Sequence, residues 1–280
     1  MREIEANTIT EAVSKMCIDA NYDIGDDIVK TFQDALDTEE SDTGKDVLRQ
    51  LIENAKIARN EGLPYCQDTG FDVFFVEMGN DLRVNGATVE QAINDGVRKG
   101  CKEGYLRASI VADPLRRKNT GDNTPAVVHL KMADGDSLKI VMAAKGGGSE
   151  NMSRIAMLTP AAGENGVKNF VVDTVSSAGP NACPPLVVGV GIGGTMEMAA
   201  ILAKKAAVRL INSKHPDEYY AKMEEDIRER CNQLGVGPMG MGGRITVLKV
   251  NIEVHPCHIA SLPVAVNINC HAARHKEVVL

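Results

Sequence analysis

Three of the seven cysteines lie in surroundings that could support metal chemistry. Cys66 lies in PYCQDTG, Cys183 in GPNACPP and Cys270 in INCHAARH. Prolines and glycines beside a cysteine fix the loop backbone, and a metal ligand needs such fixing. The three cysteines are far apart in sequence and would meet only in the folded chain, so their spacing alone is a weak signal. A shared site would favour zinc, copper or an iron–sulfur cluster, because thiolates are soft ligands.

The other four cysteines are interpreted as bystanders. Cys17 and Cys101 fall within predicted helices, Cys231 lies near a predicted helix end, and Cys257 immediately precedes His258. The odd number of cysteines and the lack of a secretion signal argue against a disulfide framework. The sequence has no CxxC pair, so neither a zinc ribbon nor a thioredoxin-type redox pair has support.

A glycine-rich segment matches a nucleotide-binding pattern but lacks its context. Residues 189–194, GVGIGG, fit G-x-G-x-x-G between a predicted strand and a predicted helix. The dinucleotide fold also needs a strand ending in an acidic residue about 20 residues later, and LINSK (210–214) does not provide it. We therefore interpret these glycines as a tight turn with close helix–strand packing, with a helix N-terminus that offers N–H groups to an anion or a cluster as the alternative.

Four segments together resemble one enzyme family. PYCQDTG (64–70), GGGSEN (146–151), GPNACPPLVVGVGIGGT (179–195) and INCHAARH (268–275) are similar to the class I, iron–sulfur-dependent fumarate hydratases and the related L-tartrate dehydratases. The segments follow the family order, and the match covers nearly the whole chain. The chain resembles the α subunit, or the N-terminal half of fused members. Because it ends soon after Cys270, the resemblance implies a separate β subunit in an α2β2 heterotetramer.

The resemblance implies a cofactor. Cys66, Cys183 and Cys270 match the three ligands of a [4Fe-4S] cluster whose fourth iron has no protein ligand. Such an open site suits a Lewis acid that binds the hydroxyl and a carboxylate of malate. Four cysteine ligands would suit electron transfer instead. Cys270, and not Cys257, matches the third ligand.

The resemblance also implies catalytic residues, because dehydration needs a base at carbon and an acid at the departing oxygen. It places Asp68 in proton transfer with a hydroxyl residue of the partner domain, although an aspartate there can also cap its own loop. It places Gln67 facing the substrate. His258 is expected to donate a hydrogen bond to a substrate carboxylate, although a lone histidine is more often structural.

A dicarboxylate substrate must be neutralised locally, since the net charge of the chain is −7. A bidentate arginine is suited to this task, and Arg107 matches a substrate arginine of the family. Taken alone, Arg107 could equally be a solvated side chain after a helix. Lys145 and Gly147, in the glycine loop, could add a cation and a backbone N–H.

The elements that must position these residues are helices and strands in mixed order. Periodicity predicts an α+β fold, rich in helices, with mixed or mostly antiparallel sheets. We expect one cluster-binding domain over residues 1–280, with the helical residues 1–62 as a possible second lobe. Predicted helices are 7–22, 24–38, 44–61, 88–104, 164–177, 195–211 and 217–234. Predicted strands are 70–78, 125–133, 137–144, 184–190, 244–254 and 263–268, the second and third forming a hairpin across DGD (134–136).

Composition excludes several classes of function. The chain has 280 residues and only one short basic cluster, 116–118, so nucleic-acid or anionic-membrane binding is not expected. It has no apolar run long enough for a transmembrane helix and no apolar signal region, so we expect a cytoplasmic protein.

Several functions are compatible with the sequence. The leading hypothesis is the α subunit of a fumarate hydratase. Close alternatives are an L-tartrate dehydratase α subunit and a related enzyme that acts on mesaconate or on another diacid such as a 2-hydroxy diacid. A non-catalytic iron–sulfur protein, either an electron carrier or an iron or oxygen sensor, is an alternative of another class. A nucleotide-binding module has the weakest support.

Overall fold

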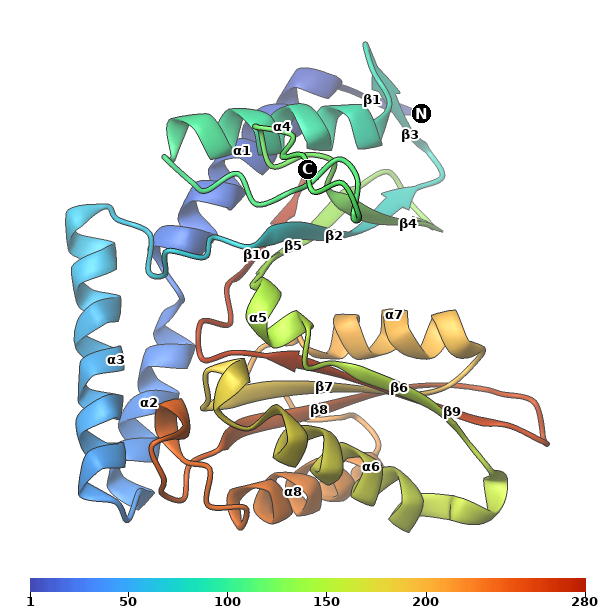
Figure 1. The fold of residues 1–280 in the computed structure, drawn as a ribbon. Helices are drawn as coiled ribbons and strands as arrows, with labels where there is room; N and C mark the ends of the chain where they lie inside the picture. The colour runs from blue at the N-terminus through green and yellow to red at the C-terminus, as the bar shows by residue number, and fades with distance from the viewer. The chain divides into compact units, whose positions relative to one another are not determined.

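A computed structural model describes residues 1–280 and confirms the predicted α+β class (Figure 1). The chain forms two compact units, and each unit is built from segments that are separate in the sequence. Unit 1 consists of 1–24, 55–147 and 274–280, and unit 2 of 25–54 and 148–273. The helical residues 1–62 therefore contribute to both units. None of the helices combines the length and apolar content that crossing a membrane requires.

Unit 1 is built on a four-stranded sheet with the strand order β10-β5-β2-β4. Its inner strand β2 has five buried residues among nine, including the consecutive residues 72–74. A two-stranded parallel sheet, β1-β3, completes the unit. The strands are β1 (Arg2–Glu5), β2 (Phe71–Gly79), β3 (Leu82–Asn85), β4 (Val127–Ala133), β5 (Leu138–Lys145) and β10 (His275–Val279).

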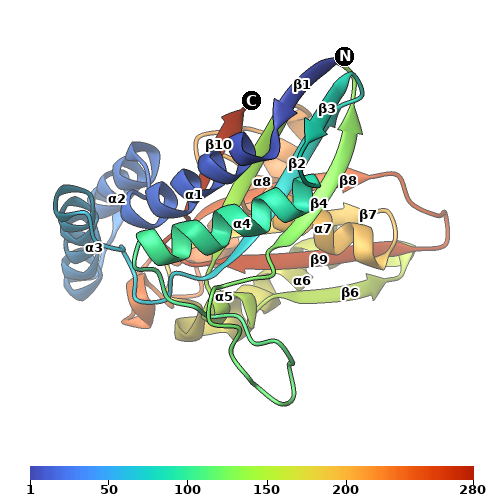
Figure 2. The same cartoon turned by 90° about the horizontal axis from the view of Figure 1, so that it is seen from above.

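Two amphipathic helices of unit 1 lie side by side over this sheet, as Figure 2 shows: α1 (Ala6–Tyr22) and α4 (Val89–Glu103). A capping box starts α4, since Thr88 and Gln91 bond each other's backbone N–H groups. The apolar faces of both helices join the buried side chains of β2 and β5 in one core.

The predicted hairpin between β4 and β5 is wrong. The two strands do not pair, because β2 lies between them, parallel to β4 and antiparallel to β5. The turn at Gly135 instead crosses the end of β2, where Gly79 N–H donates to Ser137 and Asp81 N–H donates to Gly135. Alternating patterns specify which face of a strand is buried and not which strand is its neighbour, so the strongly apolar β2 takes the central place.

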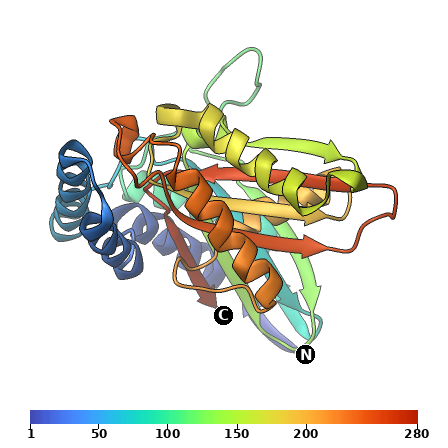
Figure 3. The ribbon, with the colours of Figure 1, turned by 90° about the horizontal axis from the view of Figure 1, so that it is seen from below.

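Unit 2 is a three-layer arrangement around the sheet β6-β9-β7-β8. Helix α7 packs on one face, and α6 and α8 lie side by side on the other (Figures 1 and 3). Short elements α5 (Gly147–Glu150), η1 (Pro160–Ala162), η2 (Gly179–Ala182) and η3 (Pro238–Gly240) occupy the connections. The longer elements are β6 (Arg154–Leu158), α6 (Gly163–Ala178), β7 (Leu186–Gly193), α7 (Met196–Ala206), α8 (Glu218–Asn232), β8 (Val247–His255) and β9 (Leu262–Asn269).

The glycines of the nucleotide-like pattern serve packing. Gly189 and Gly191 lie inside β7, where a Cβ atom would stand about 2 Å from backbone oxygens of α7 (2.1 Å from that of Ala203 and 2.0 Å from that of Ala199). Only glycine lets this helix approach the strand so closely. The interpretation as close helix–strand packing is confirmed at these two positions.

The carboxylate of Glu39 joins the helical part of unit 2 to the rest of that unit. Glu39 lies between α2 (Asp26–Thr38) and α3 (Asp42–Glu61), and its side chain is almost wholly buried. It accepts the backbone N–H groups of Glu40, Ser41 and Arg244 on Oε1, and that of Ile245 on Oε2. Burial alone would raise the pKa of Glu39, but the four donors outweigh burial and hold the pKa below its ordinary value.

We expect Glu39→Gln to lower the free energy of unfolding at pH 7 by about 2 kcal/mol, because charge-assisted hydrogen bonds are lost. A lowered pKa means that this stabilisation is complete above the ordinary pKa of 4.5 and is lost as the pH falls through the folded-state pKa. The difference between variant and wild type should therefore shrink below about pH 4. Urea unfolding at pH 7 and at several pH values below 4.5 measures it.

Glu40→Gln is the matched control, since the Glu40 side chain is exposed and pairs only with the exposed Arg244. We expect a change below about 0.5 kcal/mol for it. Equal losses in the two variants would contradict the assigned role of Glu39.

Candidate active site

The Asp68 carboxylate is held by backbone N–H groups from two loops of unit 1. Its Oδ1 accepts from Gly70 N at 3.0 Å, and its Oδ2 accepts from Gly147 N at 3.0 Å. The first bond is the local turn expected for an aspartate, whereas the second brings in the glycine loop. Asp68 is only partly buried, so the half-buried carboxylate is fixed in place while one side of it stays accessible.

The residues beside Asp68 orient Arg107. Arg107 N–H donates to the Thr69 hydroxyl at 2.9 Å, and this hydroxyl donates to the Arg107 carbonyl at 3.3 Å. The Arg107 guanidinium donates to Gln67 Oε1 at 3.4 Å. Both long side chains are exposed. Unit 1 thus brings an accessible cation and an amide to the side of Asp68, which suits binding of a carboxylate.

The glycine loop lies against the Asp68 loop because Gly70 has no side chain. Gly70 adopts φ +80°, and a Cβ atom there would stand 2.7 Å from the backbone oxygen of Lys145. Lys145 itself is buried at the end of β5, and its Nζ donates to the Gly146 carbonyl at 3.1 Å. Of the two predicted anion-binding groups in this loop, Gly147 touches Asp68 directly, and Lys145 lies in the interior.

Unit 2 brings two of the predicted cysteine ligands to one end of its sheet. Strands β7 and β9 are antiparallel with Val187 opposite Asn269, so the start of β7 lies beside the end of β9. Cys183 precedes β7 and Cys270 follows β9. The Cys183 carbonyl accepts from the backbone N–H of His271 at 3.3 Å and from its ring Nδ1 at 3.0 Å. Cys183 has φ 54°, a left-handed conformation that is unusual for a non-glycine residue.

The seven cysteines differ in surroundings, and none forms a disulfide. Cys66, Cys183 and Cys270 are half-buried in loops. In contrast, burial raises the pKa of the Cys17, Cys101 and Cys231 thiols, that of Cys231 to about 12, so these thiols stay protonated. Cys257 is exposed and donates to the Ser261 carbonyl in its own turn.

Half-buried cysteines in loops suit a soft-metal centre better than cysteines buried in a core. The structure has no group of three His, Cys, Asp or Glu side chains arranged around a single metal ion. An iron–sulfur cluster does not need such a group, because each cysteine binds a different iron of the cluster.

The structure does not bring His258 to the end of the sheet where Cys270 lies. His258 lies in the exposed turn before β9, and Cys270 follows the last residue of that strand. A strand of eight residues spans roughly 25 Å. The Nδ1 atom of His258 accepts from Ala260 N at 3.1 Å, which leaves the proton on Nε2 as a donor. A pocket of about 510 Å³ beside His258 is lined mainly by apolar atoms, with Met157, Met196 and Met198 among its residues.

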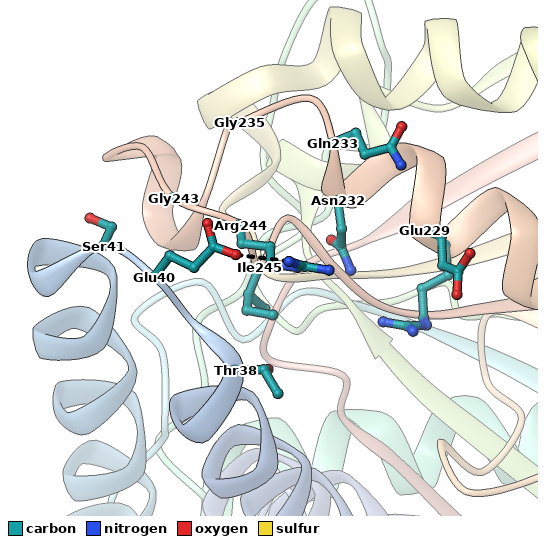
Figure 4. A pocket seen from close by; sticks show the side chains of 11 residues that line it. Thr38, Glu40, Ser41, Glu229, Asn232, Gln233, Gly235, Gly243, Arg244 and Ile245 are labelled. Carbon is teal, nitrogen blue, oxygen red and sulfur yellow. Dashed lines mark hydrogen bonds and ion pairs between the residues drawn. The ribbon is translucent and has the colours of Figure 1, made fainter.

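Another cleft of unit 2, of about 1070 Å³, contains none of the predicted site residues (Figure 4). Its arginines are paired, Arg228 with Glu225 and Arg244 with Glu40. We interpret it as a polar surface recess beside the hydrogen bonds of Glu39 with Arg244 and Ile245.

Sequence reasoning missed two buried residues that contact the Asp68 loop. Arg274 donates to the Asp68 carbonyl at 2.7 Å and to Asn21 Oδ1 at 2.8 Å. Asn21 in turn accepts the Tyr65 N–H at its carbonyl, at 2.8 Å. Arg274 lies in the segment INCHAARH and could have been noticed there, whereas Asn21 gives no sequence signal because it lies within an ordinary amphipathic helix.

Comparison with known proteins points to one family. The family model described as Fumarate hydratase (Fumerase) matches residues 10–279. A protein of Methanocaldococcus jannaschii, provisionally named as an L(+)-tartrate dehydratase subunit alpha, is 40% identical over 272 residues, 95% of each chain. The L(+)-tartrate dehydratase subunit alpha of Escherichia coli strain UTI89 is 35% identical over 271 residues, 96% of this chain and 89% of that protein. The protein of the same name from strain K12 is 34% identical over the same shares.

Proposed function

Because the chain belongs to the fumarate hydratase family, we propose that it is the α subunit of a hydro-lyase that interconverts fumarate and L-malate. The observation that carries the proposal is the arrangement in unit 1. Asp68 is fixed by two N–H donors beside the accessible side chains of Gln67 and Arg107. A carboxylate for proton transfer next to a carboxylate-binding arginine is what dehydration of a hydroxy diacid needs.

Each of the site residues has its own role in the proposed reaction. Arg107 and Gln67 bind and orient a substrate carboxylate. The N–H of Gly147 holds the Asp68 carboxylate in the orientation that faces the substrate. Asp68 exchanges the proton, on carbon or on the departing oxygen. Lys145 acts from the interior by fixing the glycine loop through Gly146.

We propose that Cys66, Cys183 and Cys270 hold a [4Fe-4S] cluster, since their accessible thiols fit that group and those of the buried cysteines do not. When bound, the cluster supplies an open iron site, a Lewis acid for the departing hydroxyl. Chain connectivity supports the proposal, because Cys66 is two residues from Asp68 and Cys270 is four residues from Arg274, which bonds the Asp68 carbonyl.

His258 has a separate place in the proposal. Since it lies at the other end of β9 from Cys270, a hydrogen bond from its Nε2 to a substrate carboxylate would be made in the site of another chain. We therefore do not count it among the residues that one chain contributes to its own site.

A second candidate function is the dehydration of L(+)-tartrate. The names of the relatives at 40% and 35% identity favour it, and the arrangement of Asp68, Gln67 and Arg107 suits either diacid equally. Those names also designate an alpha subunit, which supports our proposal that a separate β subunit completes the active site of this chain.

The decisive experiment is an anaerobic assay of the iron-reconstituted chain with and without its β subunit, on L-malate and on L(+)-tartrate. We expect turnover only with the β subunit, and the ratio of kcat/KM for the two diacids identifies the substrate. Robust turnover by the chain alone would refute the dependence on β. A redox-active cluster without hydro-lyase activity on any diacid would instead support an electron carrier or sensor.

A further inference from the structure

Two buried ionisable side chains, Asp72 and Arg274, lie near the Asp68 loop in unit 1. Asp72, on β2, lies opposite Ala144 on β5, and the N–H of Ala144 donates to the Arg274 carbonyl at 3.1 Å. The three residues thus form one row across neighbouring strands. Asp72 is 3% exposed and Arg274 is 2% exposed. Charged side chains this deep are rare and need compensation.

Arg274 uses its guanidinium to fix both ends of the loop that carries Cys66 and Asp68. Its Nη1 atom donates to the Asp68 carbonyl at 2.7 Å and to Asn21 Oδ1 at 2.8 Å. The Asn21 carbonyl accepts the Tyr65 N–H at 2.8 Å. The loop is therefore held at residue 65 through Asn21 and at residue 68 directly.

Asp72 fixes the other side of the same site through Asn123. The amide of Asn123 donates to Asp72 Oδ2 at 3.2 Å and to the Gly70 carbonyl at 3.3 Å. The Oδ1 atom of Asn123 accepts from Ser109 N at 2.9 Å, two residues beyond Arg107. Burial raises the pKa of Asp72 to about 7, although the bond from Asn123 and the charge of Arg274 oppose the rise.

No direct ion pair joins Asp72 to Arg274, and two buried ionisable side chains are a poor means of stabilising a core, because apolar side chains of similar size often do as well or better. The contacts of this pair converge instead on the segment that presents Asp68. We propose that Arg274 and Asp72 are positioning residues that hold the Asp68 carboxylate and the Arg107 loop in reacting geometry. This inference rests on the proposed hydro-lyase function.

The test uses a double variant that separates the effect on the position of Asp68 from the effect on the stability of the protein. Arg274→Met removes the bonds to Asn21 and to the Asp68 carbonyl and the positive charge that favours ionised Asp72, so both stability and kcat should fall. In Asp72→Asn/Arg274→Met, both charges are gone, so the melting temperature and the iron content should recover. The kcat of the double variant should stay about 10- to 100-fold low with KM changed less, because the bond to the Asp68 carbonyl is still missing.

Arg209→Met is the matched control. Arg209 also donates from Nη1 to a side-chain oxygen, of Glu224, and to a backbone carbonyl, of Ile252, and it contacts none of the proposed site residues. We expect lower stability with an unchanged kcat for the folded enzyme. Recovery of kcat together with melting temperature in the double variant, or an equal kcat loss in Arg209→Met, would overturn the proposal.

Two further measurements keep the test decisive. If the double variant does not fold, Arg274→Lys keeps the charge, but its shorter side chain does not reach the position of Nη1, which donates to both Asn21 and Asp68, so kcat should again fall while stability holds; full activity would overturn the proposal. Hydrogen exchange of the segment 66–70 should rise in Arg274→Met and not in Arg209→Met. This readout needs no turnover, so an inactive wild type would refute the function without deciding the positioning, whereas unchanged exchange would refute the positioning itself.

Discussion

Replacing Cys270 by Ser is expected to remove the iron from the reconstituted chain and to lower hydro-lyase activity with the β subunit at least ~10³-fold. A serine hydroxyl does not ionise near neutral pH as a thiol can, so it is a poor ligand for iron. The wild-type chain should hold about four irons, as a [4Fe-4S] cluster requires. Loss of a Lewis acid worth several kcal/mol accounts for the size of the fall in rate. Anaerobic iron and sulfide analysis with an EPR spectrum measures the loss.

Cys257→Ser is the control for this substitution, since Cys257 is the exposed cysteine near Cys270 in sequence and bonds only within its own turn. We expect wild-type iron content and activity for it. An unchanged cluster in Cys270→Ser would show that Cys270 is not a cluster ligand. This result would remove the basis of the hydro-lyase proposal.

Asp68→Asn is expected to lower kcat by about 10²- to 10⁴-fold while the iron content stays at the wild-type level. Asparagine has the same size and keeps one oxygen, which can accept the N–H of Gly70 or of Gly147 but not both, and it cannot exchange the proton. Single-turnover and steady-state kinetics on the preferred diacid should show a change in kcat larger than that in KM.

Asp113→Asn provides the comparison for a purely structural role. Asp113 also lies in a loop of unit 1, where its Oδ1 accepts the N–H groups of Leu115 and Arg116. We expect a change in stability alone for this variant. A similar small effect of both substitutions on kcat would show that Asp68 only caps its loop.

The family and the types of the main elements could be predicted from sequence because their signals are local. Four segments indicated the fumarate hydratase family, and the match of the family model over residues 10–279 confirms this resemblance. Helices such as α1 and α4 agree with prediction within a residue or two, since a 3.6-residue period defines both and a capping box also marks the start of α4. Strands as short as β3 and β10 escaped prediction, because four or five residues carry too little periodicity.

Sequence alone determined the residue types of the candidate site and placed Gln67 and Asp68 beside Cys66, because neighbours in a loop are neighbours in space. The remaining features depend on contacts between distant parts of the chain. The tertiary structure inserted β2 between β4 and β5, joined Gly147 and Arg274 to Asp68, and placed His258 and Cys270 at opposite ends of one strand. Side-chain periodicity reports which face of an element is buried, whereas strand partners and buried charge pairs depend on contacts between distant parts of the chain, which no local pattern encodes.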